Sequence, residues 1–300
     1  MFGVRFSVSY LALKTENRKP KTENQMQPQQ FQLHADIELR HWWFVARRQI
    51  MRRLIREVLP PSPEATIVDV GCGTGANIGM LAGDYRCVGI DTSAEAIDRA
   101  RPSFPLVHFL QGRAPGDLGP IMQQARLVML MDVMEHVSDD FAMLSELMAA
   151  AEAGTHFLLT VPADEALWSE HDESFGHYRR YDLARLERVW AGLPVTTRLV
   201  SYFNARLLPL VRLVRARNRR RGRAAGKVGT DFWLPSPPVN RLLQAIFAGE
   251  GRRLAQVLSG RRRAGYSAGS SLIAVLRREA GSIAVRQKPS DLPPDHIVGK

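Results

Sequence analysis

Apolar and polar residues follow two different periods between residues 34 and 203, and the two periods alternate along the chain. Short and nearly continuous apolar runs predict strands that are buried on both faces. Between them, apolar residues recur at the three- and four-residue spacing of amphipathic helices. This alternation predicts an α/β fold in which a mostly parallel sheet carries helices on both faces. The strand-like runs are 67–70, 87–91, 106–110, 127–131 and 156–161, with two more at 196–202 and 271–276.

A helical pattern precedes the first strand and contains the adjacent aromatic residues Trp42, Trp43 and Phe44. Three neighbouring aromatic side chains cannot all face one core, because a helix turns its residues in different directions. Some of them are therefore candidates for the wall of a pocket, where Arg47 or Arg48 can reach an anion. In the alternative interpretation, Trp42 and Phe44 belong to the core and both arginines are solvated.

Three glycines follow the first strand, and Gly71, Gly73 and Gly75 stand at alternate positions. Glycine has no Cβ atom, so the backbone can turn tightly there and approach a ligand closely. A helix that begins near Asn77 can direct the amides of its first turn toward the same ligand. A strand, a glycine-rich turn and a helix at the start of an α/β domain predict a nucleotide-cofactor site.

An acidic residue ends the second strand, at the place where a ribose contact is expected. Asp91 stands about 20 residues after the first glycine, at the end of the run 87–91. NAD-dependent enzymes share this acid and the G-x-G-x-x-A spacing that ends at Ala76, so a dinucleotide is one alternative. Asp69 and Gly75 favour a different cofactor, because a pyrophosphate gains nothing from a carboxylate placed before the glycines.

The run from Asp69 to Gly75 (Asp-Val-Gly-Cys-Gly-Thr-Gly) resembles motif I of class I methyltransferases that depend on S-adenosylmethionine (SAM). A second run, Asp-Val-Met-Glu-His-Val from Asp132 to Val137, is similar to the segment after the fourth strand in the ubiquinone-pathway O-methyltransferase-like group. The resemblance covers residues 38–203. It implies a Rossmann-like sheet of seven strands, mostly parallel, with an antiparallel last strand and a helical insertion before it.

The same resemblance implies SAM as the cofactor and assigns residues to it. Asp69 would orient the amino group of the methionine moiety, and Asp91 would hold the ribose hydroxyls. Adenine is often contacted by an acid after a glycine in this family, but Arg113 stands at that position, which leaves Gln111 or backbone groups for the contact. The predicted cofactor-binding residues are Asp69, Gly71, Cys72, Gly73, Thr74, Gly75, Asp91, Thr92, Gln111, Gly112, Asp132 and Val133.

Methyl transfer from a sulfonium is an in-line displacement, so alignment is the main task of the protein. A hydroxyl nucleophile also benefits from a base, and histidine titrates in the right range. The candidates are His171, His136 and His177, and His171 is slightly favoured because it lies in the expected substrate loop. Each of the three can instead be a structural residue that only makes hydrogen bonds.

Two further observations limit the chemistry. Glu135 and His136 lack an evident third ligand in the sequence, so we expect no metal ion. The chain also has no Asn/Asp-Pro-Pro-Tyr segment, which is the signature of methyltransferases that act on planar nitrogens. The acceptor atom expected is therefore an oxygen or a carbon, on a small or lipid-linked molecule.

The chain carries a formal net charge of +11, from 41 basic and 30 acidic residues, and much of the surplus lies between Arg206 and Arg223. Leucines alternate with arginines in this segment. The pattern favours a lid or a solvated helix first and a peripheral membrane contact second. Nucleic acid ranks third, because the segment lacks aromatic residues for base stacking. We expect residues 204–265 to form a basic helical cap, including a second helix at 239–258.

The remaining segments complete the expected organisation. We expect disordered tails at 1–33 and 279–300, a SAM-binding core at 34–203, and the last core strand within 266–278. Two cysteines give no disulfide framework, and no apolar run reaches the ~18 residues that cross a bilayer, so we expect a cytoplasmic protein, membrane-associated if the basic segment binds lipid. An NAD-binding oxidoreductase and a non-catalytic membrane- or partner-binding module remain as alternatives.

Overall fold

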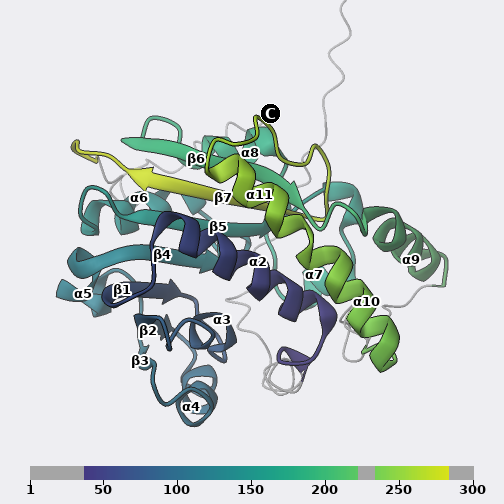
Figure 1. Ribbon diagram of the computed structural model, residues 1–300, viewed down its shortest axis with the longest axis horizontal. Helices are drawn as coiled ribbons and strands as arrows, with labels where there is room; N and C mark the ends of the chain where they lie inside the picture. The colour runs from purple at the N-terminus through teal and green to yellow at the C-terminus, as the bar shows by residue number, and fades with distance from the viewer. Residues whose placement is uncertain (1–36, 222–233, 284–300) are drawn as a thin grey trace, which may run out of the picture.

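The computed structural model describes residues 37–221 and 234–283 (Figure 1). Within these ranges the chain forms a seven-stranded sheet of order β3-β2-β1-β4-β5-β7-β6. Strand β7 is antiparallel to both β5 and β6, and the pairs among the first five strands are parallel. The expected Rossmann-like α/β fold is therefore confirmed. The strands are β1 (Ser62–Val70), β2 (Tyr85–Asp91), β3 (His108–Gln111), β4 (Ala125–Met131), β5 (His156–Pro162), β6 (Val195–Phe203) and β7 (Ser271–Arg278).

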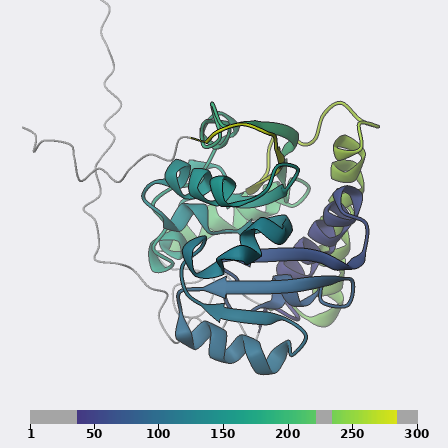
Figure 2. The same cartoon turned by 90° about the vertical axis from the view of Figure 1, so that its left-hand side faces the viewer.

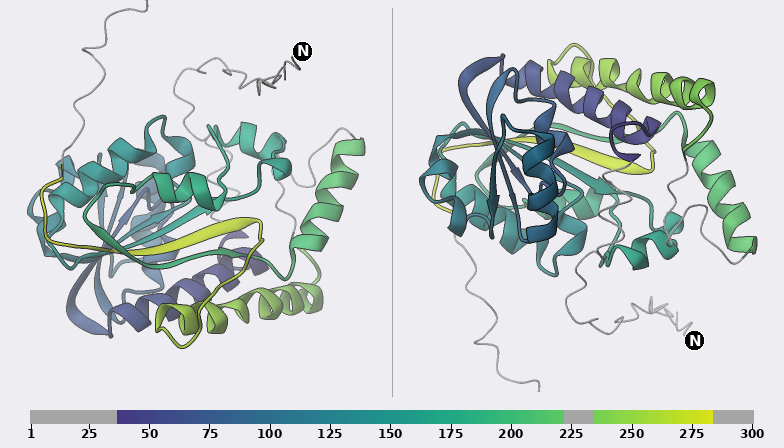
Figure 3. Two further views of the ribbon diagram at one scale, coloured as in Figure 1. Left: turned by 90° about the horizontal axis from the view of Figure 1, so that it is seen from above. Right: turned by 90° about the horizontal axis from the view of Figure 1, so that it is seen from below.

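One face of the sheet is covered by helices from both halves of the chain (Figure 2). They are α2 (Trp42–Val58), α3 (Ala76–Gly79), α4 (Ala94–Ser103), α10 (Pro237–Ala248) and α11 (Glu250–Leu258). Helix α2 lies beside α10 and α11 although they are distant in the sequence (Figure 3). Its apolar stripe, with Met51, Leu54 and Ile55, is fully buried against the sheet and against Phe247 and Leu254 of this neighbouring pair. Burial of that stripe stabilises the helix more than its intrinsic propensity does.

The other face carries α5 (Pro120–Gln124), α6 (Asp140–Ala150) and α8 (Leu183–Arg188). Their buried residues include Met122, Leu144 and Leu186, which pack on the second set of strand side chains. Because both faces are covered, the strands read as continuous apolar runs rather than as alternating ones.

The C-terminal ends of the parallel strands meet at one edge of the sheet, and irregular segments gather there (Figure 1). They include the short helix α7 (Glu170–Ser174), the basic helix α9 (Leu208–Arg221) and the 3-10 turns η2 (Met134–His136) and η3 (Glu165–Leu167), whereas η1 (Gly116–Leu118) follows β3. The segment 204–265 is thus divided between two places. Helix α9 stands at this edge, whereas α10 and α11 run along α2.

Two helices differ from the expected ones. The helix expected at 77–82 is limited to α3 (Ala76–Gly79), and turns follow it. The helix expected at 239–258 is broken at Gly249 into α10 and α11. A Cβ atom on Gly249 would lie 2.6 Å from Nη1 of Arg206, and the backbone N–H of Arg206 donates to Oε1 of Glu250 at 2.8 Å. The segment that follows β6 therefore packs against the break between the two helices. The spacing of apolar residues cannot predict this contact.

The expected disordered tails fall mostly on residues that the structure does not describe. Only residues 279–283 of the second tail lie within the described ranges. The same holds for the end of the basic segment, where Arg223 lies outside the described residues.

Candidate active site

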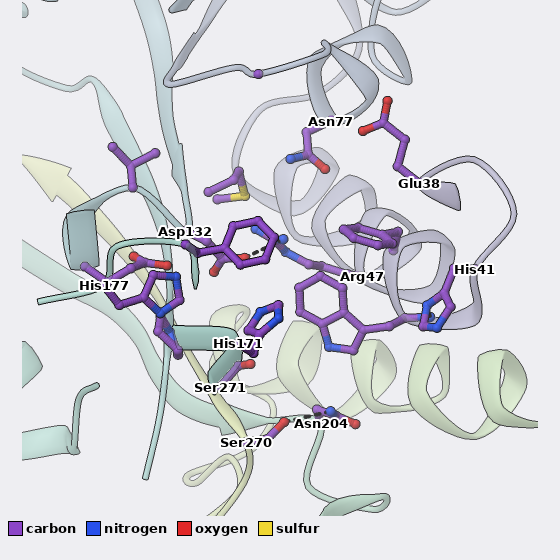
Figure 4. Close-up of a pocket in the computed structure, with 18 of the residues that line it drawn as sticks. Glu38, His41, Arg47, Asn77, Asp132, His171, His177, Asn204, Ser270 and Ser271 are labelled. Carbon is purple, nitrogen blue, oxygen red and sulfur yellow. Dashed lines mark hydrogen bonds and ion pairs between the residues drawn. The ribbon is translucent and has the colours of Figure 1, made fainter. Parts of the chain in front are cut away.

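A cavity of about 1280 Å³ opens at the C-terminal edge of the sheet. Its wall includes the glycine-rich turn after β1, the end of β2, the turn after β4, the start of α2 and parts of α9 and α10. Figure 4 shows Arg47 and Asp132 between the side marked by Asn77 and the side marked by His171 and His177. Ligands of open α/β sheets bind at this edge, so the cavity is the candidate site.

The glycine-rich turn has a backbone shape that only glycine adopts at low cost. Gly71, Gly73 and Gly75 have φ values of +70°, +53° and +86°. A Cβ atom on Gly71 would also lie 2.7 Å from a methyl group of Val133, so the turn after β1 touches the turn after β4. These glycines bring two cavity walls together, in addition to leaving room for a ligand.

Asp91 connects the glycine-rich turn to the start of the next helix. Its Oδ2 accepts a hydrogen bond from the backbone N–H of Gly73 at 2.9 Å, and its Oδ1 accepts one from Ser93 at 2.9 Å. The carboxylate is half-buried and lines the cavity. It is therefore held in place by two backbone donors while one side remains accessible to a ligand.

Asp69 lies behind the wall rather than on it. The side chain is fully buried, and neither carboxylate oxygen has a hydrogen-bond partner among the described residues. Burial raises the pKa of Asp69 to about 8, although the positive charge of Arg47 opposes the shift. Asp69 is expected to orient the amino group of the methionine moiety, and this role stays a prediction, because the carboxyl does not line the cavity.

Arg47, Asp132 and Thr160 form a connected polar triad, of which Arg47 and Asp132 line the cavity and Thr160 lies buried behind them. Nη1 of Arg47 lies 2.6 Å from Oδ2 of Asp132, and its Nη2 donates to the hydroxyl of Thr160 at 2.8 Å. That hydroxyl donates in turn to Oδ1 of Asp132 at 3.0 Å. The guanidinium also lies over the ring of Trp43, 4.9 Å from its centroid. Of the two arginines considered in the sequence, Arg47 is the one that lines the cavity.

The cavity brings together most of the predicted cofactor residues. Gly71, Cys72, Gly73, Thr74, Asp91, Thr92, Gln111, Asp132 and Val133 line it. Asp69, Gly75 and Gly112 do not line it. Gly112 is instead packed against Asp117, whose Oδ2 would lie 2.6 Å from an added Cβ atom. The roles of these three residues stay predictions that rest on the resemblance.

Sequence reasoning missed Glu38, which lines the cavity and accepts a hydrogen bond from Thr74 Oγ1 at 2.8 Å. It stands before the aromatic residues in a stretch without apolar periodicity, so no sequence signal identifies it. Asn77 also lines the cavity, near the N-terminus of α3. Its place at a helix start after the glycines is a signal that sequence reasoning can use.

The three candidate histidines lie together on one side of the cavity. The ring centroids of His136 and His177 are 4.7 Å apart, and those of His171 and His177 are 6.2 Å apart. Asp172 orients one of them, His177. Its fully buried carboxylate lies 2.9 Å from Nδ1 of His177 and accepts from Nε of Arg180 at 2.8 Å.

Burial lowers the pKa of two of these three histidines. It lowers the pKa of His136 to about 3, with the neighbouring His177 adding to the shift. It lowers the pKa of His171 well below the ordinary value, despite the opposing charge of Asp172. Both rings are therefore neutral at pH 7, and the lowered pKa makes each of them a weaker base than a solvated imidazole. For Asp172, burial alone would raise the pKa, but the hydrogen bond from His177 and the charge of Arg180 lower it overall.

Helix α9 closes the cavity from the outside. Arg215 donates to the backbone carbonyl of Leu167 and lies 3.9 Å from Oδ2 of Asp172, and Arg212 pairs with Asp164 at 3.0 Å. Apolar side chains of α9 complete the wall: Leu210, Val211 and Val214. The lid interpretation of the basic segment fits this position.

Comparisons with known proteins agree with the geometry. A family described as a methyltransferase domain matches residues 39–211, which is more than half of the chain. The trans-aconitate 2-methyltransferase of Azoarcus sp. (strain BH72) is 31% identical over 121 residues, which are 39% of this chain and 46% of that protein. The enzyme of that name from Deinococcus radiodurans is 28% identical over 136 residues, which are 41% of this chain and 53% of that protein.

The chain thus spans about half the length of the curated relatives it matches. Among solved structures, one similar chain comes from the complex between the Haloferax volcanii Trm112 methyltransferase activator and a methyltransferase. It has a TM-score of 0.53 and 17% identity, and the match covers 87% of this chain and 99% of that chain. This likeness concerns the fold.

Proposed function

Because the chain belongs to the methyltransferase domain family, we propose that it transfers a methyl group from SAM to an oxygen, or a carbon, of a small or lipid-linked molecule. One observation carries the proposal. The glycine-rich turn, Asp91 and Asp132 follow three different strands and converge on one cavity that also holds His136, His171 and His177. The residues proposed to hold the methyl donor and the residues proposed as the base therefore line the same cavity.

The residues present fit SAM. Asp91 offers a carboxylate, fixed by two backbone N–H groups, to the ribose hydroxyls. The Gly71 position has no room for a side chain, as expected where a ligand and a second loop both come close. Arg47 and Asp132 present one positive and one negative group, which suit the carboxylate and amino group of the methionine moiety. Arg113 stands where related enzymes often have an acid, so Gln111, which lines the cavity, is assigned to adenine.

When bound, SAM supplies a methyl group that is activated by its positively charged sulfur. The chain has to align an acceptor atom with that methyl group and exclude water. Trp43, Phe44 and Leu207 give the cavity an apolar wall for this purpose. His171 is kept as the proposed base because it lines the cavity, with His136 and His177 as alternatives. Burial opposes this role, because it lowers the pKa of His171.

The acceptor is proposed from the shape and charge of the outer wall. The large cavity and its apolar side chains suit a molecule such as the quinone precursors of the ubiquinone-pathway group that the sequence resembles. The names of the two relatives give trans-aconitate as a further acceptor to test. Both molecules present an oxygen nucleophile.

We further propose that the segment from Arg206 to Arg223 contacts anionic lipid when the acceptor is lipid-linked. Leu210, Leu213 and Val214 of α9 are 44%, 67% and 41% exposed beside its arginines. This combination suits a peripheral contact. No helix in the described ranges is long and apolar enough to cross a membrane. Nucleic acid remains the third choice for this segment.

Calorimetric titration with SAM, with NAD as a parallel ligand, tests the proposal. We expect wild-type protein to bind SAM and not NAD, and Asp91→Ala to lose most of the affinity because the ribose contact and the fixed turn are both lost. Asp98→Ala is the matched control, because Asp98 lies on the solvent face of α4 with a side chain that is 73% exposed. Binding of NAD alone would support the oxidoreductase, and binding of neither would support a non-catalytic module.

If SAM binds, an acceptor screen follows, with quinone precursors, lipid-linked sugars and trans-aconitate. Methylated product is detected by mass spectrometry, with and without vesicles that contain anionic lipid. Stimulation by the vesicles at low salt, and its loss at high salt, is the expected result for a lipid-linked acceptor. Equal rates with neutral vesicles would argue against the membrane contact.

A further inference from the structure

Glu135, His136 and His177 offer three ligand atoms that lie within 4.8 Å of one another, on the wall of the cavity. We infer that these three side chains form a site for one divalent metal ion, best matched to Zn²⁺. The site cannot be recognised in the sequence, because only Glu135 and His136 are neighbours there. The third ligand, His177, comes from the loop before α8. The fold brings that loop under the turn after β4, where the backbone N–H of Tyr178 donates to the carbonyl of Glu135 at 2.8 Å.

Glu135 is the first argument for a cation. The side chain has no exposed surface, and neither of its oxygens accepts a hydrogen bond from any other described residue. A buried carboxylate without partners is costly, and buried charges in proteins are paired or coordinate metals. Glu135 differs in this respect from Asp172, which has partners on both oxygens.

The two histidines are already oriented as metal ligands usually are. Nδ1 of His177 lies 2.9 Å from Oδ1 of Asp172, so its Nε2 remains for an ion. The backbone carbonyl of Phe175 hydrogen-bonds to the ring of His136, so one nitrogen of that ring also remains. Metal-binding histidines nearly always donate their second N–H to a carboxylate or a backbone carbonyl, which fixes the tautomer. Here His177 has the carboxylate of Asp172 as its partner, and His136 has the backbone carbonyl of Phe175.

The donor set selects the type of metal. Two imidazoles and one carboxylate suit Zn²⁺, whereas Mg²⁺ and Ca²⁺ prefer oxygen ligands alone. Bonds of about 2.1 Å in a tetrahedral site place donor atoms roughly 3.4 Å apart. The three ligand atoms lie within 4.8 Å of one another, and small changes of side-chain rotamer can shorten these distances to the spacing that the ion requires. Three protein ligands leave a fourth position open toward the cavity, which is the pattern of catalytic rather than structural zinc.

The role of the ion rests on the proposed function. An acceptor hydroxyl bound at the open position loses its proton more easily, because the cation stabilises the oxyanion. The proton passes to His171, and the oxygen forms a bond to the methyl carbon. The bond between that carbon and sulfur breaks, and sulfur keeps the electron pair. No oxidant or reductant is required.

The test uses the purified full chain, freed of metal by a chelator and titrated with Co²⁺, which substitutes for zinc and absorbs visible light in four- or five-coordinate sites. We expect saturation at one Co²⁺ per chain and competition by Zn²⁺. Glu135→Gln and His177→Gln should lose affinity by more than the roughly 10–100-fold that loss of an outer partner costs. His108→Gln, at an exposed position on β3, is the matched control and should titrate like the wild type.

Each sample is also titrated with SAM and unfolded by heat, which separates the outcomes. Glu135→Gln should fold as well as the metal-free wild type, since it replaces a buried carboxyl group that has no hydrogen-bond partner among the described residues, but Co²⁺ should no longer raise its melting temperature. Absence of the Co²⁺ absorption band in folded wild-type protein would overturn the site. A band that persists in Glu135→Gln and His177→Gln would overturn it as well. Failure of SAM binding would instead contradict only the proposed function.

Discussion

The buried carboxyl of Asp69 lowers the stability of the folded state at neutral pH. The carboxyl is fully buried and has no hydrogen-bond partner among the described residues, and burial raises its pKa from 3.8 to about 8. Between these two values the folded state binds more protons than the unfolded state. The stability that the protonated group contributes is therefore complete below pH 3.8 and is lost as the pH rises through about 8.

Asp69→Asn should remove this dependence on pH. We expect the free energy of unfolding of the wild type to fall relative to the variant by up to about 1.4 kcal/mol per pH unit between pH 5 and 7. Urea unfolding across this range measures the difference, and the comparison cancels other titrating groups. Asp98→Asn, at an exposed position, serves as the control. Parallel curves for wild type and Asp69→Asn would show that Asp69 is ionised at low pH in the folded protein.

At the scale of elements, Asp172 joins the short helix α7 to α9. Its carboxylate contacts His177 and Arg180 within the loop and lies 3.9 Å from Nη1 of Arg215 on α9. Removing one partner of a buried ion pair leaves the other uncompensated. The loop that carries His171 and His177 and the helix that closes the cavity therefore share contacts with one side chain.

Asp172→Asn should destabilise the protein by about 3 kcal/mol and accelerate amide hydrogen exchange in both α7 and α9. Mass spectrometry of exchanged peptides measures this. Asp182→Ala is the control, because Asp182 caps α8 by accepting from the N–H of Arg185 at 2.7 Å. Loss of that cap should cost about 1 kcal/mol and affect α8 alone. Unchanged exchange in α9 of Asp172→Asn would show that α9 is held independently.

At the scale of the molecule, Asn240 joins α10 to the start of α2, nearly 200 positions earlier in the chain. Its Oδ1 accepts from the N–H of Trp42 at 2.9 Å, and its Nδ2 donates to the carbonyl of Arg40 at 2.8 Å. The segment that it holds carries Glu38 and Trp43, which line the cavity.

Asn240→Ala should lower the free energy of unfolding by about 1–3 kcal/mol, because two hydrogen bonds are lost and a backbone donor is left without its partner. It should also weaken SAM binding, since the start of α2 is no longer fixed. Urea unfolding and calorimetric titration measure the two effects. Arg241→Ala, at an exposed neighbouring position, should change neither. Full SAM affinity in Asn240→Ala would show that α2 is positioned by its apolar stripe alone.

The sequence predicts the parts of this molecule that depend on local patterns. The strands follow from the apolar runs, and the tight turn follows from the three alternate glycines. Gly71 and Asp91 are therefore identified from the sequence alone. Contacts between distant segments determine the positions of Glu38 and Asn240. The proximity of Glu135 to His177 depends on such contacts as well. Their local sequence carries no periodicity or spacing that marks them. The break at Gly249 is missed for the same reason, because its neighbour Arg206 is distant in the sequence.

The position of β7 has a consequence for synthesis on the ribosome. Strand β7 is the last strand along the described residues, yet it lies between β5 and β6, and β6 pairs with no other strand of the described sheet. Until residues 271–278 leave the exit tunnel, β6 has no neighbour and β5 presents an open edge. Open edges invite pairing with other chains. The nascent protein therefore completes its sheet only after residue 278 has left the tunnel, and a chain stalled before residue 271 is the form that chaperones must protect.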